Sequence, residues 1–262
     1  MKKLFALPLA ALVLAACSES TDPNVADVAP AFAKPIKPPP GPSPATTLVA
    51  SYLFNGSIEA QAGAGIGTDT DDGSAAGQAT DLHYAPSDAS NGFVGRFNNT
   101  NTRLILNVVN PASKYTVEFD LYIIGSWDGR GKQAQSGTFE ANVFQIGYRC
   151  GAGAVVPIFT TTFSNQYTVQ QDFPLSYLKG GNKAGTGSVP GSLDALGYKD
   201  YPLLSNTPPF RSFGDATYHL TYTVGNVCGG AAPQFVFSST APGQQSNWDE
   251  SWGIDNLKLF AD

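Results

Sequence analysis

The sequence has few of the residues that nucleic-acid binding and transition-metal sites require. Its 262 residues include 15 Lys and Arg against 21 Asp and Glu, which gives a net charge of −6 at pH 7. No basic run occurs beyond Lys2-Lys3, so the electrostatic attraction that drives nucleic-acid binding is missing and this partner is excluded. Two histidines and three cysteines without a Cys-x-x-Cys pair are poor ligand material for zinc or haem.

Charged residues and helical periodicity are also scarce. Only 14% of the residues are charged, whereas 28 are Gly and 19 are Pro, a composition that excludes a coiled coil or a long helical bundle. The 16 Phe, 11 Tyr and 3 Trp supply enough large apolar side chains for a substantial core. The length allows one large all-β domain or two small domains.

The first residues have the pattern of an export signal. Lys2-Lys3 precede an apolar stretch, Leu4 to Ala16, that is too short to span a bilayer as a helix and ends in small residues before Cys17. Residues Leu14-Ala15-Ala16-Cys17 resemble the bacterial lipobox, in which the cysteine becomes the lipidated first residue of the mature chain. A plain secretory signal of residues 1–16, with an incidental Cys17, is the alternative.

The lipobox resemblance implies a location as well as a modification. Acyl chains on Cys17 would hold the protein on a membrane without crossing it. Ser18 stands where Gram-negative lipoproteins retained at the inner membrane carry aspartate, so the resemblance implies the outer membrane, with a Gram-positive cell surface as the alternative.

The segment after the signal cannot bury a core. Residues 17–46 contain eight prolines, including Pro38-Pro39-Pro40, and show no period of two or 3.6. Such a segment favours extended, polyproline-like geometry of roughly 3 Å per residue. We expect a disordered tether that holds a domain away from the membrane; disorder without a role is the alternative.

Residues 47–262 have the pattern of one antiparallel β-domain. In the clearest run, Lys114 to Ile124, Tyr115 and every second residue after it are apolar, whereas Thr116, Glu118 and Asp120 lie on the other face. Runs rich in Val, Ile, Tyr, Phe and Thr predict strands at 47–54, 92–97, 102–109, 114–124, 139–148, 155–163, 216–224, 233–239 and 251–260. This spacing favours a β-sandwich or jelly roll.

Two stretches do not fit the strand pattern. Residues 56–91 are small and polar, and residues 176–214 are rich in Gly and Pro, so both are predicted to be long loops on the sandwich. Within the second, Ser192 to Leu196 could form one short helix before Gly197.

Four segments resemble secreted sandwich domains. Thr47–Gly56, Gly92–Phe97 and Tyr115–Tyr122 resemble, in order and spacing, the opening strands of concanavalin A-like or laminin-G-like jelly rolls. Trp252–Phe260 resembles the closing strand of related domains. The resemblance implies a concanavalin A-like jelly roll.

Cys150 and Cys228 are the pair that remains once Cys17 is lipidated. Both are predicted at strand ends, and in an exported protein we expect them to form a disulfide. Two buried free thiols are the alternative.

Glu118 and Asp120 share one predicted sheet face. A Glu-x-Asp pair resembles part of the Glu-x-Asp-x-Glu signature of laminarinase-type glycoside hydrolases, but Tyr122 stands in place of the second glutamate. A phenol with a pKa near 10 is a poor acid/base at neutral pH. The alternatives are that these carboxylates pair with Lys or Arg of a neighbouring strand, or that they bind a ligand.

Calcium is the one cofactor for which the sequence offers ligands. Asp69, Asp71 and Asp72 give several carboxylate oxygens in a predicted loop, although they do not fit the EF-hand spacing. A solvated acidic turn is the alternative. A second acidic set could converge beside the last strand: Asp128, Asp249, Glu250 and Asp255.

The three tryptophans lie near predicted turns or strand edges. Trp127 and Trp248, with Asp128 nearby, could stack against a sugar ring and bind its hydroxyls, or they could be buried. Trp252 is predicted in the core. His83 and His219 are predicted to be structural.

Three functions remain open. We expect a lipid-anchored protein whose sandwich binds a glycan or other extracellular polymer without catalysis, through Glu118, Asp120, Tyr122 and the tryptophan sites. The first alternative is a structural or adhesive envelope protein that binds a protein partner through its long loops, which burial of Trp127 and Trp248 would favour. The second is a degenerate or active glycoside hydrolase, which needs another carboxylate about 5 to 9 Å from Glu118 or Asp120.

Overall fold

The computed structural model describes residues 47–56, 64–70, 82–98, 102–130, 141–198, 214–225, 227–240 and 250–262. The chain divides into two units, Met1–Pro38 and Pro39–Asp262, and all described residues belong to the second. The described residues form eleven strands and no helix, which confirms the all-β prediction.

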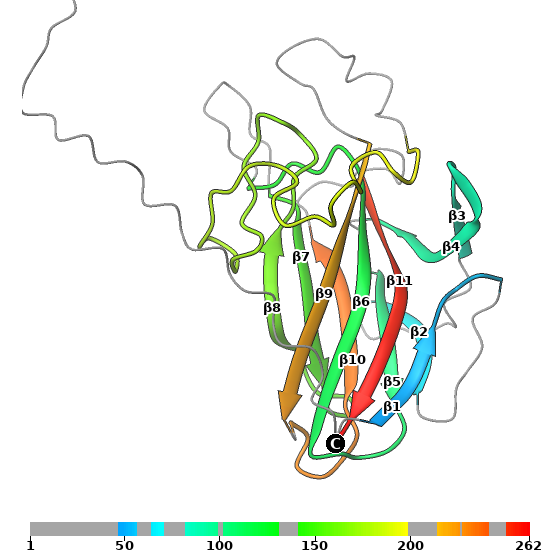
Figure 1. Cartoon of the computed structure of the whole chain (residues 1–262). Helices are drawn as coiled ribbons and strands as arrows, with labels where there is room; N and C mark the ends of the chain where they lie inside the picture. Colours follow the sequence, from blue (N-terminus) through cyan, green and yellow to red (C-terminus); the bar gives the residue numbers. More distant parts are fainter. Residues whose placement is uncertain are drawn as a thin grey trace, which may run out of the picture. The chain divides into compact units, whose positions relative to one another are not determined.

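The strands form two antiparallel sheets that pack as a β-sandwich (Figure 1). The six-stranded sheet has the order β3-β4-β11-β6-β9, with β1 also paired to β11. Its strands are β1 (Thr47–Tyr52), β3 (Leu82–Ala85), β4 (Asp88–Phe97), β6 (Lys114–Gly125), β9 (Asp215–Gly225) and β11 (Glu250–Ala261). The five-stranded sheet has the order β2-β5-β10-β7-β8, formed by β2 (Ala64–Thr70), β5 (Thr102–Val108), β7 (Val143–Arg149), β8 (Val156–Thr162) and β10 (Gln234–Thr240).

The core lies between the sheets and is rich in aromatic rings. Phe119 of β6 meets Phe237 of β10 edge to face, with ring centroids 5.1 Å apart. Trp252 of β11 contacts Phe144 of β7 at 5.4 Å and is fully buried, as predicted. Burying one such side chain contributes roughly 1.5–3 kcal/mol, so the two sheets are held mainly by these contacts.

All nine predicted strands are present, but the prediction for residues 56–91 was wrong in part. This stretch contains β2 and β3, and β4 begins within it. Strand β2 is Ala-Gly-Ile-Gly-Thr-Asp-Thr and has no apolar alternation. It pairs along its whole length with β5, whose Leu104 and Leu106 are buried. Backbone pairing to an apolar neighbour therefore forms this strand, and its own side chains give little signal.

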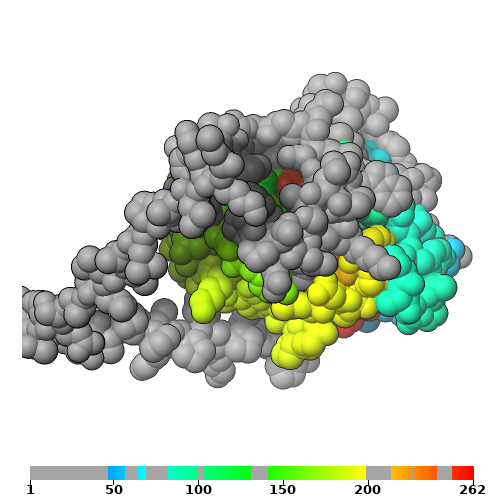
Figure 2. All heavy atoms as spheres, turned by 90° about the horizontal axis from the view of Figure 1, so that it is seen from above, coloured from blue at the N-terminus to red at the C-terminus, as the bar shows by residue number. Residues whose placement is uncertain are grey.

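The described part of the second predicted loop, residues 176–198, contains turns and no strand. The predicted helix at Ser192–Leu196 is absent, because Asp194 has a φ of 58°, which interrupts a right-handed helix. Residues 189–198, which we call the capping loop, bind the start of β9: the Asp215 carboxylate accepts hydrogen bonds from Leu196 N at 2.9 Å and Tyr198 N at 3.0 Å. Figure 2 shows the yellow capping loop beside the teal β3–β4 hairpin, where Ser87 N donates to Leu196 O at 2.9 Å.

Asp172 organises the segment between β8 and the capping loop. Its side chain is fully buried and forms an ion pair with Arg130, with Nε 3.3 Å from Oδ1. Its oxygens also accept hydrogen bonds from Gly180 N at 2.9 Å and Leu178 N at 3.1 Å. A buried carboxylate is tolerated when its lone pairs are filled in this way, so Asp172 has a structural role.

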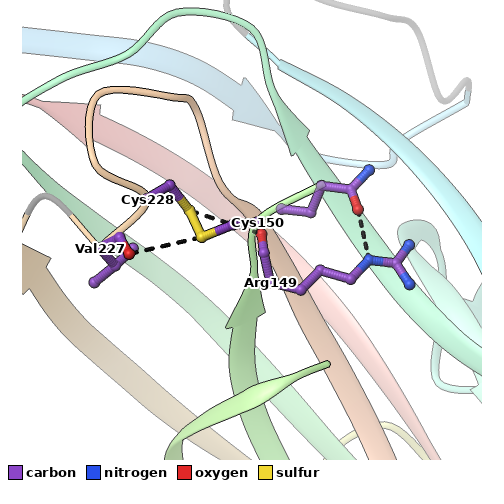
Figure 3. The surroundings of a disulfide bond; sticks show 5 residues. Arg149, Cys150, Val227 and Cys228 are labelled. Carbon is purple, nitrogen blue, oxygen red and sulfur yellow. Dashed lines mark hydrogen bonds between the residues drawn. A yellow bond between two sulfur atoms is a disulfide. The ribbon is translucent and has the colours of Figure 1, made fainter. Parts of the chain in front are cut away.

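The predicted disulfide between Cys150 and Cys228 is present and ties the end of β7 to the β9–β10 connection (Figure 3). The bridged cysteines are separated by 78 residues. Beside the bridge, Arg149 Nε donates to Gln234 Oε1 at 2.5 Å.

The first described residue lies at the same end of the sandwich as the disulfide. Thr47 pairs with Ala261, and Ala261 pairs with Tyr115 at the start of β6. The Tyr115 ring in turn contacts Phe235 of β10, next to the bridged end of β7. The capping loop and the turn after β6 lie at the opposite end (Figure 1). Thr47 therefore lies away from the capping loop.

Candidate ligand-binding face

The predicted carboxylate row lies on the outer face, by which we mean the surface of the six-stranded sheet that faces away from the five-stranded sheet. Strand β6 is central in this sheet, and its alternation places Phe119 and Leu121 inward. Glu118 and Asp120 therefore point outward, and their side chains remain 15% and 20% exposed.

A β-bulge in β11 adds further polar groups to this row. Asp120 pairs with Asp255 and Glu118 pairs with Lys258, so β11 contains one extra residue between these positions. Without the bulge, Asp255 and Lys258 would point to opposite faces. Asn256 sits in the bulge with a φ of 50°, a left-handed conformation that asparagine adopts more readily than most residues.

The side chains of the row are joined by hydrogen bonds and ion pairs. Asp120 Oδ1 lies 2.7 Å from His219 Nδ1, on β9, and Asp120 Oδ2 accepts from Asn256 Nδ2 at 2.7 Å. The same amide donates to Asp255 Oδ2 at 3.2 Å. Glu118 Oε1 accepts from Lys258 Nζ at 2.7 Å. We call the set Glu118, Asp120, His219, Asn256 and Lys258 the polar row.

The Glu118–Lys258 pair confirms the sequence alternative in which these carboxylates pair with a cation of a neighbouring strand. The sequence reasoning missed His219, Asn256 and Lys258 as members of the row. One signal was available, because Asp and Asn are depleted in strands and Asp255-Asn256 in succession inside a predicted strand is typical of a bulge.

Tyr122 closes one end of the polar row and is not available to a ligand. Its ring is 4% exposed and packs with Phe93 of β4, at 5.2 Å, and with Leu196 of the capping loop. Its hydroxyl donates to Asp255 Oδ2 at 3.1 Å. The prediction of Tyr122 as a ligand-binding residue was therefore wrong: this side chain anchors the capping loop to the sheet.

Burial raises the pKa values of Asp255 and Tyr122, the two groups beneath the polar row. Burial raises the pKa of Asp255 to about 6, and repulsion from Asp120 acts in the same direction, while hydrogen bonds from Asn256 and Tyr122 oppose it. Burial and the neighbouring Asp255 charge also raise the pKa of Tyr122 far above its ordinary value. Tyr122 thus stays protonated and serves as a donor to Asp255.

Asp255 supplies the second carboxylate that a glycosidase would need, but it cannot reach a substrate. Its side chain shares the Asn256 amide with Asp120, so the two carboxylates are close. Asp255 is only 4% exposed, and Tyr122 and Asn256 occupy its oxygens. A general acid must lie within hydrogen-bond reach of the bond it cleaves, and this geometry argues against hydrolysis at the polar row.

The predicted aromatic platform is not formed by Trp127. This residue is fully buried, and its Nε1 donates to Ser251 O at 2.9 Å, so its ring belongs to the core. Asp128 is 7% exposed and accepts a hydrogen bond from Gln166 Nε2. The prediction that Trp127 and Asp128 contact a ligand was therefore wrong. Trp248 lies outside the described residues.

The predicted calcium ligands are described only in part. The backbone of Asp69 lies within β2, which ends at Thr70, and Asp71 and Asp72 lie outside the described residues. The second acidic set does not converge: Glu250 accepts from Asn142 Nδ2 at 2.6 Å near Asp128, whereas Asp255 lies in the bulge. Asp249 lies outside the described residues. Within the described ranges, no group of three or more His, Cys, Asp or Glu side chains is placed to hold a metal ion.

The segment between β8 and β9 exposes large apolar side chains that sequence reasoning did not single out. Leu178 has a φ of 64° and is 64% exposed. Others in this segment are at least 37% exposed: Tyr167, Leu175, Tyr177 and Leu193. We call these five residues the apolar loop residues.

The anchoring signal lies outside the part of the chain that the structure describes, and this includes Cys17. No described segment forms a helix with the length and apolar character needed to span a bilayer.

No protein family model matches the chain, and no curated protein matches it in sequence. Among solved structures, the K1 cleaved adhesin domain of Lys-gingipain from Porphyromonas gingivalis W83 is similar, with 11% identity and a TM-score of 0.38 over 82% of this chain and 99% of that one. The K2 cleaved adhesin domain of Lys-gingipain has 11% identity and a TM-score of 0.34 over 80% and 96%. At these TM-scores neither similarity carries an argument about function.

Proposed function

We propose that this chain is a lipid-anchored protein of the cell envelope whose β-sandwich binds a neutral glycan, or another hydroxyl-rich extracellular polymer, without catalysis. The polar row of the outer face is the binding surface. The proposal rests on one observation: partly exposed hydrogen-bond donors and acceptors lie next to one another on one sheet surface, on three neighbouring strands.

The chemistry of the polar row favours a neutral ligand. Glu118 with Lys258, and Asp120 with His219, place acceptors and donors side by side. Sugar hydroxyls both donate and accept hydrogen bonds, so they can use both members of each pair. A polyanion would meet the carboxylates, and a polycation would meet Lys258, so charge selection works against both.

Anchoring through Cys17 fits the place where the chain enters the domain. The lipobox resemblance implies acyl chains at Cys17, on an outer membrane, and residues 17–46 would be the tether. Thr47 lies at the end of the sandwich opposite the capping loop.

A glycan array tests the proposed function. The full chain with Cys17→Ala is applied to neutral, acidic and basic glycans, and to envelope polysaccharide of the source organism. We expect binding to neutral glycans, with little dependence on salt, because no net charge drives it. Absence of binding to every glycan would overturn the proposal.

A protein partner is the second candidate, and two observations favour it. The apolar loop residues expose apolar surface in the segment between β8 and β9, and such surface marks protein contacts more often than sugar contacts. Trp127, one of the two tryptophans whose burial would favour a partner, is buried. Mild crosslinking in cells, with Leu178→Asp as the variant, tests this candidate: loss of a crosslinked species would support it.

A further inference from the structure

The two edge strands on one side of the sandwich differ in how they are protected. Strand β8 ends the five-stranded sheet and β9 ends the six-stranded sheet; Phe159 of β8 lies against Tyr222 of β9, with ring centroids 5.3 Å apart. An exposed edge presents unpaired backbone groups, and proteins protect edges with proline, bulges or a covering loop.

Strand β8 has all three of these devices. Phe173 N donates to Thr162 O at 3.1 Å and Tyr177 N donates to Thr160 O at 2.7 Å, so a loop covers the second half of β8. Toward the start of β8, the register with β7 shifts at a bulge, and Pro157 has no backbone N–H to donate.

Strand β9 is protected over only part of its length. The capping loop covers its start, where Asp194 N donates to Asp215 O at 3.0 Å and Val189 N donates to Thr217 O at 2.8 Å. The ladder between β9 and β6 continues to Gly225 without a register shift. Every second residue therefore points its N–H and C=O away from β6, beginning with Asp215 and Thr217.

The residues that continue this series are His219, Thr221 and Thr223, which we call the open edge. No described residue donates to or accepts from their backbone groups on that side. The stretch from His219 to Gly225 contains no proline, lysine or carboxylate, and it is rich in the Thr, Tyr and Val residues that favour strands. Among the residues that the structure describes, the open edge thus lacks every device that protects β8.

We propose that the open edge is an interface between two copies of this chain, which pair β9 with β9 in antiparallel fashion about a two-fold axis at Thr221. This register places Thr221 opposite Thr221 of the second copy and His219 opposite Thr223. Such a pair is self-complementary, because Thr–Thr neighbours across strands are favourable and no like charges meet.

Other occupants fit the open edge less well. The chain's own residues 17–46 contain eight prolines, so they cannot supply a continuous row of backbone donors. A charged peptide gains nothing from an edge whose side chains are neutral, apart from His219. The capping loop sets the length of the interface, because it already occupies the edge at Thr217.

The pairing has a consequence for the outer face. Because the two-fold axis is perpendicular to the sheet, the outer faces of both copies lie on one side of a continuous sheet. The side chain of His219 belongs to both the polar row and the open edge, so the polar rows of the two copies lie close to each other across the axis.

The test uses the full chain with Cys17→Ala, so that acyl chains do not drive association. Light scattering after size exclusion, over a concentration series, should give twice the chain mass at high concentration.

Thr221→Pro removes the outward N–H of Thr221 and should halve that mass. Thr221→Lys, which puts two cations on the axis, should also halve it. Thr221→Val keeps the N–H and the strand preference and should remain dimeric. Unchanged near-ultraviolet circular dichroism shows that each variant is folded.

A cysteine at the axis gives an independent measurement. Hydrogen-bonded antiparallel pairs have Cα atoms about 5.5 Å apart, which a disulfide can bridge. Thr221→Cys should therefore form a covalent dimer on mild oxidation, whereas Ser113→Cys, also at the surface, should not. A monomeric chain at every concentration, or equal crosslinking of both variants, would overturn the proposal. A monomer that binds an added extended peptide at this edge would assign it to another protein.

Discussion

Asn256 offers the sharpest structural test of the polar row, because its backbone and its side chain contribute separately to the free energy of unfolding. Its φ of 50° is strained for most residues, and its amide donates to both Asp120 and Asp255. Asn256→Gly relieves the backbone but removes the amide, which costs about 1.5–3 kcal/mol for hydrogen bonds to charged acceptors. Asn256→Ala removes the amide and also incurs about 1–2 kcal/mol of left-handed strain.

Asn256→Asp keeps the tolerance for a positive φ but replaces a donor with a third carboxylate. Unit charges 4 Å apart interact by about 1 kcal/mol in water and about 4 kcal/mol near a protein surface. Because Asn256 is half-buried, we expect a loss of roughly 2–4 kcal/mol at pH 8. The loss should shrink toward pH 4, where the new carboxylate is protonated in the folded state.

Urea unfolding followed by tryptophan fluorescence measures this series, since Trp127 and Trp252 are buried in the folded state and exposed on unfolding. At pH 8 we expect wild type to be the most stable and the Gly variant the next, with the Ala and Asp variants below both. An Asn256→Asp chain as stable as wild type at pH 8, or an Ala variant more stable than the Gly variant, would refute the reasoning.

Three further predictions concern the anchor, the disulfide and the buried carboxyl group. Cys17→Ala should move the protein from the membrane to the soluble fraction and abolish fatty-acid labelling; a wild type that is soluble and unlabelled would contradict lipidation. Replacing Cys150 and Cys228 with Ser should lower the free energy of unfolding by about 4 kcal/mol, because a 78-residue separation is no longer closed; a change below about 1 kcal/mol in urea titrations would contradict this. Asp255, with its pKa raised to about 6, binds a proton more tightly in the folded than in the unfolded chain, so its contribution to stability is present below pH 4 and lost as the pH rises to about 6. Asp255→Asn should flatten that part of the stability profile, and an unchanged slope would count against the shift.

The sandwich could be predicted from the sequence because its strands carry their own pattern. Strand β6 alternates apolar and polar residues from Tyr115 to Leu121, and between Val117 and Leu121 the burial follows that alternation. Strand β2 has no such pattern and exists because β5 pairs with it, which local sequence does not encode. The disulfide could be predicted by counting cysteines in a chain that is predicted to be exported.

The candidate site could be predicted only in its central part. Glu118 and Asp120 were found because they share a face of one strand. Their partners come from β9 and β11, and the register of neighbouring strands depends on a bulge that alternation cannot reveal. For Trp127 the sequence left a sugar platform and burial both open, because this residue precedes Asp128-Gly129, a turn pattern; in the structure its indole N–H has a buried acceptor.

The central claim is that the polar row binds the ligand, and Asp120→Asn tests it most directly. Asp88→Asn, at the exposed start of β4, is the matched control because it removes the same charge elsewhere. Affinity for the glycan selected on the array is measured for both variants, with the urea midpoint as a check of folding. Asp120→Asn should weaken binding by about tenfold or more, as expected for one charge-assisted hydrogen bond, and Asp88→Asn should bind like wild type. Equal affinity of the folded Asp120→Asn chain and wild type would contradict the account.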